Sequence, residues 1–282
     1  MGFYGVIKEN SLIDSFDIEM ENFNKLVDSL NILKENGIIL ELSIGDIKKK
    51  IKDFIDGFIN WATKIFIQVQ AFIFKNTIIK ETKELMNNTK ILSTDNNFDL
   101  YKFKSKNDKS IKDIFTPLIE QWENNIYEEL FVSDKNRIDE LAKNAVAMKE
   151  EIEKKRKKFL DQVKSYNFTI GKDKEDIQAI TTNKFSEFKE YQTFTIKQIE
   201  ECDPVVKKYQ SKIDTFKKQY NTVMSKNVDY STLLQRVKDD IGTLRETVVF
   251  LYRIVAMQIN ILRKNNIAFK KALKEEKSDG SL

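Results

Sequence analysis

Histidine is absent from all 282 residues of the sequence. This absence excludes serine–histidine and cysteine–histidine catalytic centres, histidine-ligated zinc and the commonest general base near neutral pH. Cys202 is the only cysteine, so neither an intrachain disulfide nor a four-cysteine metal site can form. A phosphate-binding glycine loop is also missing. We therefore expect no enzyme activity, no catalytic, cofactor-binding or metal site, and no small-molecule substrate.

Glycine and proline are scarce, with 8 and 2 residues respectively. Tight turns and bulges depend on these residues, so a turn-rich β fold is not expected. Hydrophobic residues make up 41% of the chain and charged residues 33%, which is unlike a disordered or membrane-spanning composition. An uninterrupted apolar run of about 18 residues, long enough for a transmembrane helix, does not occur. The fold class predicted from these features is all-α.

The charges are mixed rather than of one sign: 48 basic and 44 acidic residues give a net charge of +4. Nucleic acid is therefore not expected as a specific ligand. The densest basic run is formed by Lys154, Lys155, Arg156, Lys157 and Lys158. Glutamates one turn earlier can pair with it, so a solvated helix face is the favoured interpretation. The alternative is a patch that contacts phosphate groups on nucleic acid or lipid.

The first 86 residues are predicted to contain two helices. Apolar residues at spacings of three and four follow Ser11, and Gly37 is a suitable helix stop. A second helix is expected to start near Ser43 and to continue to about Met86. Its middle portion reads WATKIFIQVQAFIF, from Trp61 to Phe74, and is apolar on almost every side.

Residues 87–110 are rich in Asn, Lys, Asp and Ser, and we predict a polar loop or a small hairpin there. Asp95, Asn97 and Asp99 imitate the first ligands of a calcium-binding EF-hand loop. Leu100 replaces the glycine that such a loop needs, and Lys106 stands where the bidentate glutamate belongs. An ordinary polar loop is therefore favoured.

Residues 111–275 are predicted to form a bundle of long helices, followed by a frayed tail at 276–282. Heptad-like spacing runs from Ile138 to Phe159, and further helices are expected from about Asp173 to Ile199 and from Val206 to Val223. The clearest signal is a strict seven-residue repeat near the C-terminus, formed by Leu234, Val237, Ile241, Leu244, Val248, Leu251, Val255, Gln258, Leu262, Asn265 and Phe269. A stripe this narrow is typical of long helices that pack at shallow angles. We expect an elongated bundle of antiparallel helices with coiled-coil-like packing.

Two stretches are apolar on more than one face: Trp61–Phe74 and Thr247–Leu262, TVVFLYRIVAMQINIL. Such helices are usually buried at the centre of a bundle, which is the favoured interpretation. A partner interface and an element that contacts a membrane are the two alternatives. The candidate interface or membrane residues are Phe54, Phe58, Trp61, Phe66, Phe72, Phe74, Val248, Phe250, Leu251, Val255 and Leu262.

The N-terminal region resembles the openings of virion structural proteins of large tailed bacteriophages. The residues that carry this resemblance are MGFYGVIKENSLIDSF and, after a helix, IGDIKKKIKDFIDGFINWATKIF. They share a short aromatic start, a Ser-capped acidic helix and an amphipathic helix that bears Lys and Trp. The resemblance covers about the first 80 residues and implies a structural component of the particle, without defined functional residues.

From these observations we expect a non-enzymatic structural or assembly protein, in the virion or the cytoplasm. Its expected partners are further copies of the chain or other structural proteins, contacted through the apolar helix faces. The first alternative is a membrane-active helical protein of the α-pore-forming type, with a bilayer as its partner. The second is an intracellular coiled-coil adaptor. The N-terminal residues lack the apolar core of a secretory signal.

Overall fold

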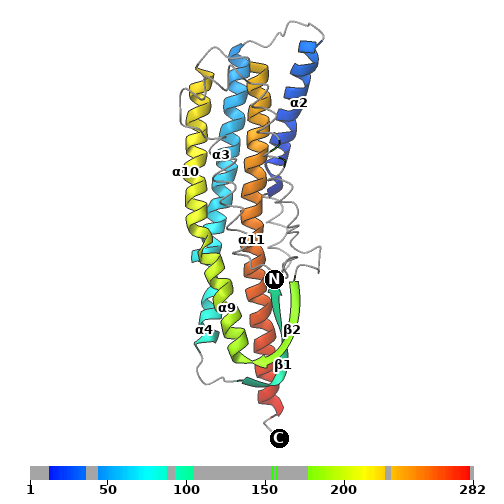
Figure 1. Cartoon of the computed structure of the whole chain (residues 1–282), viewed down its shortest axis with the longest axis vertical. Coiled ribbons are helices and arrows are strands. Elements are labelled where there is room, and N and C mark those ends of the chain that lie inside the picture. The colour runs from blue at the N-terminus through cyan, green and yellow to red at the C-terminus, as the bar shows by residue number, and fades with distance from the viewer. Residues whose placement is uncertain are drawn as a thin grey trace. The chain divides into compact units, whose positions relative to one another are not determined.

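The computed structural model describes residues 13–35, 44–87, 93–103, 154, 157, 177–225 and 230–279, which are mostly helical. The helices are α2 (Asp17–Glu35), α3 (Ile44–Phe74), α4 (Thr77–Met86), α9 (Phe185–Glu200), α10 (Cys202–Met224) and α11 (Tyr230–Asp279). Strands β1 (Ser93–Phe103) and β2 (Ile177–Lys184) pair with each other (Figure 1). The prediction of a predominantly helical protein is confirmed.

The chain divides into two compact units. Unit 1 comprises Met1–Ile67, Ile119–Ser165 and Lys208–Phe250, and unit 2 comprises Gln68–Leu118, Tyr166–Lys207 and Leu251–Leu282. Helices α3, α10 and α11 contribute residues to both units.

The two strands correct the sequence prediction at two places. Residues 93–103, expected within a polar loop or small hairpin, form β1, and residues 177–184, expected at the start of a helix, form β2. In β1 the side chains alternate, with Phe98 and Leu100 buried and Asp99 exposed. The strands are antiparallel, and Leu100 lies opposite Ile180. Residues 104–176 separate the partners, so local spacing near Ile180 gives no sign of the pairing that makes it a strand.

The helix boundaries also differ from the prediction in detail. The helix expected from Ser43 to about Met86 ends at Phe74, and α4 occupies its last ten residues. Residues 276–279, expected to fray, belong to α11. The heptad-like spacing between Ile138 and Phe159 falls outside the described residues, apart from residues 154 and 157.

In unit 1, aromatic rings join α2 and the turn before it to α3. The ring of Phe16 stacks on Phe54 at 5.6 Å and on Trp61 at 5.4 Å between centroids. Phe23, two turns further along, stacks on Phe54 at 3.8 Å. Phe16 and Phe58 are almost completely buried. Burial of aromatic side chains of this size provides a large part of the stability of a helix pair.

Polar contacts link the remaining helix pairs of unit 1. Arg245 of α11 forms an ion pair with Asp17, and Lys238 reaches Asp28 at 3.2 Å, both in α2. Between α3 and α10, Lys217 lies 2.7 Å from Asp56.

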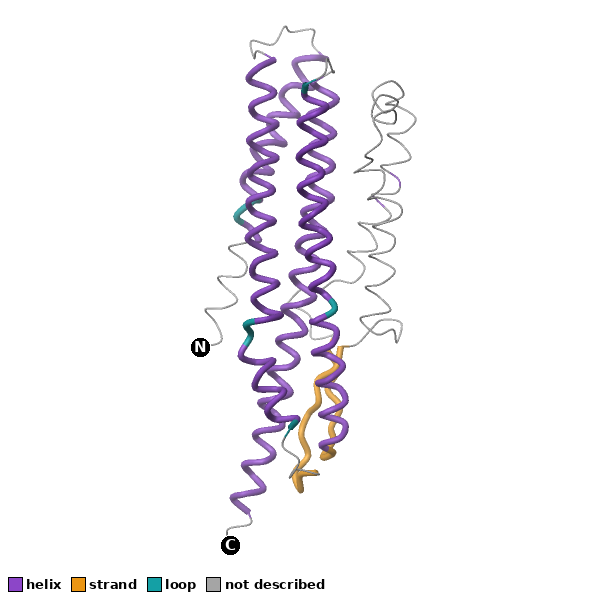
Figure 2. Tube along the Cα trace, turned by 90° about the vertical axis from the view of Figure 1, so that its left-hand side faces the viewer, coloured by secondary structure: helices purple, strands orange, loops and turns teal. Residues whose placement is uncertain are grey.

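The hydroxyl of Tyr220 in α10 donates to buried Asp240 of α11 at 2.5 Å. The parts of α2, α3, α10 and α11 in unit 1 therefore run side by side around one core, as Figures 1 and 2 show.

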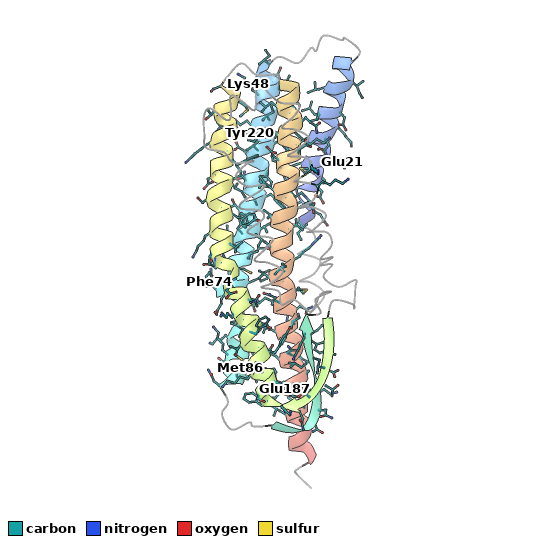
Figure 3. All side chains as sticks on the ribbon, in the orientation of Figure 1. Glu21, Lys48, Phe74, Met86, Glu187 and Tyr220 are labelled. Atoms are coloured by element: carbon teal, nitrogen blue, oxygen red, sulfur yellow. The ribbon has the colours of Figure 1, made fainter. Side chains whose placement is uncertain are left out.

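In unit 2, the strand pair packs through Phe98 on a cluster of aromatic rings. The ring of Phe98 meets Phe188 of α9 edge-on at 6.3 Å and Phe269 of α11 at 5.2 Å. Phe188 and Phe269 stack on each other at 4.3 Å. Beside this cluster, α4 contacts α9, where the hydroxyl of Thr193 donates to the sulfur of Met86 at 3.5 Å. Figure 3 labels Met86 in α4 and Glu187 near the start of α9.

We predict that Gly242→Ala stabilises the protein. Gly242 lies inside α11, where glycine costs about 1 kcal/mol relative to alanine. A Cβ atom there would lie 3.9 Å from Cε of Met20, an ordinary van der Waals contact. Urea denaturation should show the free energy of unfolding increased by about 1 kcal/mol. Lys218→Ala, an exposed change in α10, serves as the control, and a loss of stability in Gly242→Ala would contradict the packing of α2 on α11.

Candidate interaction surfaces

The apolar stretch of α3 is mostly core. Its buried side chains, with at most 5% of their surface exposed, are Trp61, Ala62, Ile65, Phe66, Val69 and Ile73. Phe16 covers Trp61, and the ring of Tyr209 lies 6.4 Å from that of Phe66. The polar residues Thr63, Lys64 and Gln68 are exposed on the opposite face. In the folded chain, this stretch therefore has a buried apolar face and an exposed polar face, although its sequence suggests a helix that is apolar on almost every side.

The apolar stripe of α11, which follows a seven-residue repeat, is buried along its whole length. All eleven of its positions, from Leu234 to Phe269, have at most 2% of their surface exposed. The second apolar stretch, Thr247–Leu262, contains additional buried residues beside this stripe, among them Tyr252, Ile254 and Ile261. The extra apolar residues widen the buried face, which is typical of a helix surrounded by several neighbours.

The predicted interface or membrane residues consequently fall into three groups. Phe54, Phe58, Trp61, Phe66, Val248, Leu251, Val255 and Leu262 are buried within the folded chain. Phe72 is half-buried with its ring 5.8 Å from Tyr252, and Phe74 is 64% exposed. The side chain of Phe250 lies outside the described part of the chain. In this conformation, Phe74 is the one candidate in the exposed class among those whose side chains are described.

Other large apolar side chains of the described residues are also exposed. They are Ile18, Ile32, Ile44, Ile67, Phe194 and Ile267. Isolated apolar residues are normal on protein surfaces and do not by themselves indicate an interface. Among the predicted basic patch residues, Lys154 and Lys157 are exposed helical positions, while Lys155, Arg156 and Lys158 are not among the described residues.

A group of buried amide side chains crosses unit 2. The Nε2 atom of Gln192 in α9 donates to Asn266 Oδ1 at 3.0 Å and to the carbonyl of Leu262 at 3.3 Å. The Nδ2 atom of Asn265 donates to Gln192 Oε1, and its Oδ1 accepts from the backbone of Tyr101 in β1 at 2.7 Å.

This amide cluster extends to α4, because Asn266 Nδ2 donates to Thr82 Oγ1 at 2.8 Å. Gln192, Asn265, Asn266 and Thr82 have at most 1% of their surface exposed. Fully bonded buried amides fix the register of the elements that they join. Asn265 could be noticed in the sequence as a polar residue on an apolar stripe, whereas Gln192 and Thr82 give no such signal.

Cys202 lies at the start of α10 and is 3% exposed. Its thiol donates to the carbonyl of Gln198 at 3.3 Å. Burial, with a smaller contribution from nearby Glu201, raises the pKa of this thiol to about 12. The thiol therefore stays protonated and unreactive at neutral pH. Within the described ranges, no group of three His, Cys, Asp or Glu residues could hold a metal ion.

No protein-family model matches the sequence, and neither the curated proteins nor the solved structures include a significant match. The resemblance of the first 80 residues to phage virion proteins thus stays a prediction. None of the described helices contains a segment long and apolar enough to cross a bilayer.

We predict that two phenylalanines of α3 differ sharply in their contribution to stability. Phe66→Ala should lower the free energy of unfolding by about 3–5 kcal/mol, since it empties a buried site beside Tyr209. Phe74→Ala should change it by less than about 0.5 kcal/mol, because this ring is 64% exposed. Chemical denaturation monitored by circular dichroism measures both values. Similar losses in the two variants would indicate that Phe74 is covered in solution.

We also predict a pH-dependent contribution from Cys202. Since folding raises the pKa of its thiol, the unfolded chain loses this proton first as the pH rises above about 9. The stabilising contribution is thus complete below pH 9 and is lost as the pH rises toward 12. Between pH 8 and pH 10, the free energy of unfolding should fall by about 1 kcal/mol more in the unmodified protein than in Cys202→Ala. Equal pH dependence in both proteins would show that the thiol titrates normally.

Proposed function

We propose that the chain is a non-enzymatic structural protein whose helices form an elongated bundle with antiparallel, coiled-coil-like packing. The observation that carries this proposal is the stripe of α11, which is buried at every position over the range 234–269. In unit 1, contacting residue pairs support antiparallel neighbours: Asp17 pairs with Arg245, and Asp28, further along α2, pairs with Lys238, earlier in α11. A helix of 50 residues with this pattern is suited to spanning distance and resisting bending.

The contact surface proposed here differs from the apolar helix faces through which partners were expected to bind from the sequence. The apolar faces of α3 and α11 are already covered by the chain itself, so they are not available to bind a partner in this conformation. Contacts with further copies or with other structural proteins would use the outer helix faces. On α2, Ile18 and Ile32 are 68% and 57% exposed and lie fourteen positions apart, a spacing that returns to nearly the same face of a helix. A role inside a phage particle is the narrower form of this proposal, and it is implied by the N-terminal resemblance.

The proposal predicts self-association without lipid binding. Light scattering should give a mass of several chains for the full-length protein, and Ile18→Ser with Ile32→Ser should reduce this mass. The double variant Ile67→Ser with Phe74→Ser is the matched control, because it removes exposed apolar residues from α3 instead.

Liposomes of neutral and anionic phospholipid provide the second part of the test. Flotation and dye-release assays should show neither binding nor leakage. Leakage would contradict the structural role and favour the membrane-active alternative, in which α3 leaves the fold. A monomer that ignores lipid would contradict self-assembly and favour the adaptor alternative.

A further inference from the structure

The two-stranded sheet of unit 2 has two edges, and a side chain of the same unit occupies one of them. The amide of Asn265 in α11 lies against β1. Its Oδ1 accepts from the backbone amide of Tyr101 at 2.7 Å, and its Nδ2 donates to the carbonyl of the same residue at 3.1 Å. A residue of a neighbouring strand would make the same pair of hydrogen bonds. Asn265 therefore takes the place of a third strand and closes the β1 edge at Tyr101.

This contact also shows which backbone groups of β2 point outward. In an antiparallel pair, a residue whose amide and carbonyl point away from the other strand lies opposite a residue that does the same. Tyr101 directs both groups at Asn265 and lies opposite Ala179 in β2. Ala179 thus presents its amide and carbonyl to the outer edge of β2, as do Ile177 and Thr181 two positions to either side. In the part of the chain that is described, no further strand or backbone group bonds to this edge.

The outer edge of β2 lacks the features that usually prevent strands from pairing. Exposed edges are commonly protected by charged side chains, by proline or by a bulge. Residues 177–183, IQAITTN, contain neither charge nor proline. The register shift adds its extra residues to β1, between Ser93 and Phe98, and not to β2. Ala179 and Thr181 are exposed, so this edge is open to another strand.

Apolar cover is also less complete on β2 than on β1. Leu100 of β1 is completely buried, whereas Ile180, directly opposite it in β2, is half-buried. Both side chains point to the same face of the sheet, because residues opposite each other in a strand pair share a face. The outer strand therefore retains exposed apolar surface that a further strand beside it would bury.

We propose that β2 pairs with β2 of a second copy of the chain, antiparallel and around a two-fold axis at Ala179. Ala179 then lies opposite Ala179 of the partner subunit, and Thr181 lies opposite Ile177 of the partner subunit. The outward amides and carbonyls of the two strands bond to one another. A second copy is the fitting occupant because two identical uncharged edges place no like charges opposite each other. This inference rests on the proposed self-association and assigns a surface to it.

The proposed pairing is limited to two copies. A two-fold contact uses the same edge of both subunits and leaves neither free for a third. The outer strands of the combined sheet are then both β1, and Asn265 already occupies the β1 edge at Tyr101. Further strand addition is blocked there, so this contact gives a dimer rather than a fibre.

A proline at position 179 tests the pairing through the mass of the full-length protein. Ala179→Pro removes an outward amide hydrogen and leaves the bonds to β1 in place, since proline is tolerated where the nitrogen of an edge strand faces outward. Light scattering should show the mass reduced about twofold or more. Ser186→Pro is the matched control, because it places proline in the first turn of α9, where backbone amides lack helical partners. The control should leave the mass unchanged.

The outcomes separate this inference from the proposed function. If the unmodified protein is an assembly and Ala179→Pro has the same mass, the β2 contact is wrong, while self-association through another surface stands. If the unmodified protein is a monomer, both are wrong. An equal loss of mass in Ser186→Pro would also overturn the β2 contact, because proline would then act without blocking the edge.

Engineered cysteines test the register without proline. Residues opposite each other in a hydrogen-bonded antiparallel pair have Cα atoms about 5.5 Å apart, so a short bismaleimide should join two copies of Ala179→Cys. Thr181→Cys is the control, because its two copies would lie about 14 Å apart along the paired strands. Cys202 is buried, so it should react little in either variant. Cross-linking in both variants alike, or none in Ala179→Cys, would overturn the two-fold pairing at Ala179.

Discussion

Burial of one face of α11 is the constraint on which the rest of the structure depends. The stripe from Leu234 to Phe269 supplies core residues to unit 1 and to unit 2. Transfer of each aliphatic or aromatic side chain from water contributes about 1.5–3 kcal/mol, so the nine apolar side chains among the eleven stripe positions outweigh any polar contact in the fold. Polar contacts hold four other elements against α11. Helix α2 forms an ion pair with Arg245, and α10 forms a hydrogen bond with Asp240. Helix α9 and strand β1 both form hydrogen bonds with Asn265.

Hydrophobic burial alone does not fix how these helices align, because an apolar stripe tolerates shifts by whole turns. Directional contacts supply that information. In unit 1 it comes from ion pairs between helices and from the bond between Tyr220 and Asp240. In unit 2 it comes from the amide cluster, where a shift of one residue would leave buried donors and acceptors without partners. Unit 1 thus uses charged groups for this purpose, whereas unit 2 adds a buried cluster of neutral amides to the ion pairs Lys83–Glu200 and Lys270–Glu81.

The sequence was informative wherever structure is decided locally. Spacing alone predicted the stripe of α11 and the amphipathic start of α3, because each depends on a helical repeat of apolar residues. It failed at β2, where Ile177 and Ile180 also fit a helical spacing and the deciding partner, β1, lies far away along the chain. The list of candidate interface residues also included side chains that the fold buries. Trp61 and Phe66 were candidates for an interface, yet Phe16 and Tyr209, whose positions only the tertiary structure reveals, cover them. The virion and membrane interpretations rest on partners outside the chain, and no internal spacing can identify those.

The pairing of β1 with β2 has a consequence for modularity. Phe103, the last residue of β1, lies directly opposite Ile177, the first residue of β2. The chain therefore leaves and re-enters the two-stranded sheet at adjacent points, the geometry that a two-residue hairpin turn also satisfies. Since the entropy of closing a loop grows only with the logarithm of its length, the sheet tolerates segments of very different size between these two residues. The strand pair, and the aromatic cluster that it contacts through Phe98, therefore depend on the pairing of these strand ends and not on the length of the chain that joins them.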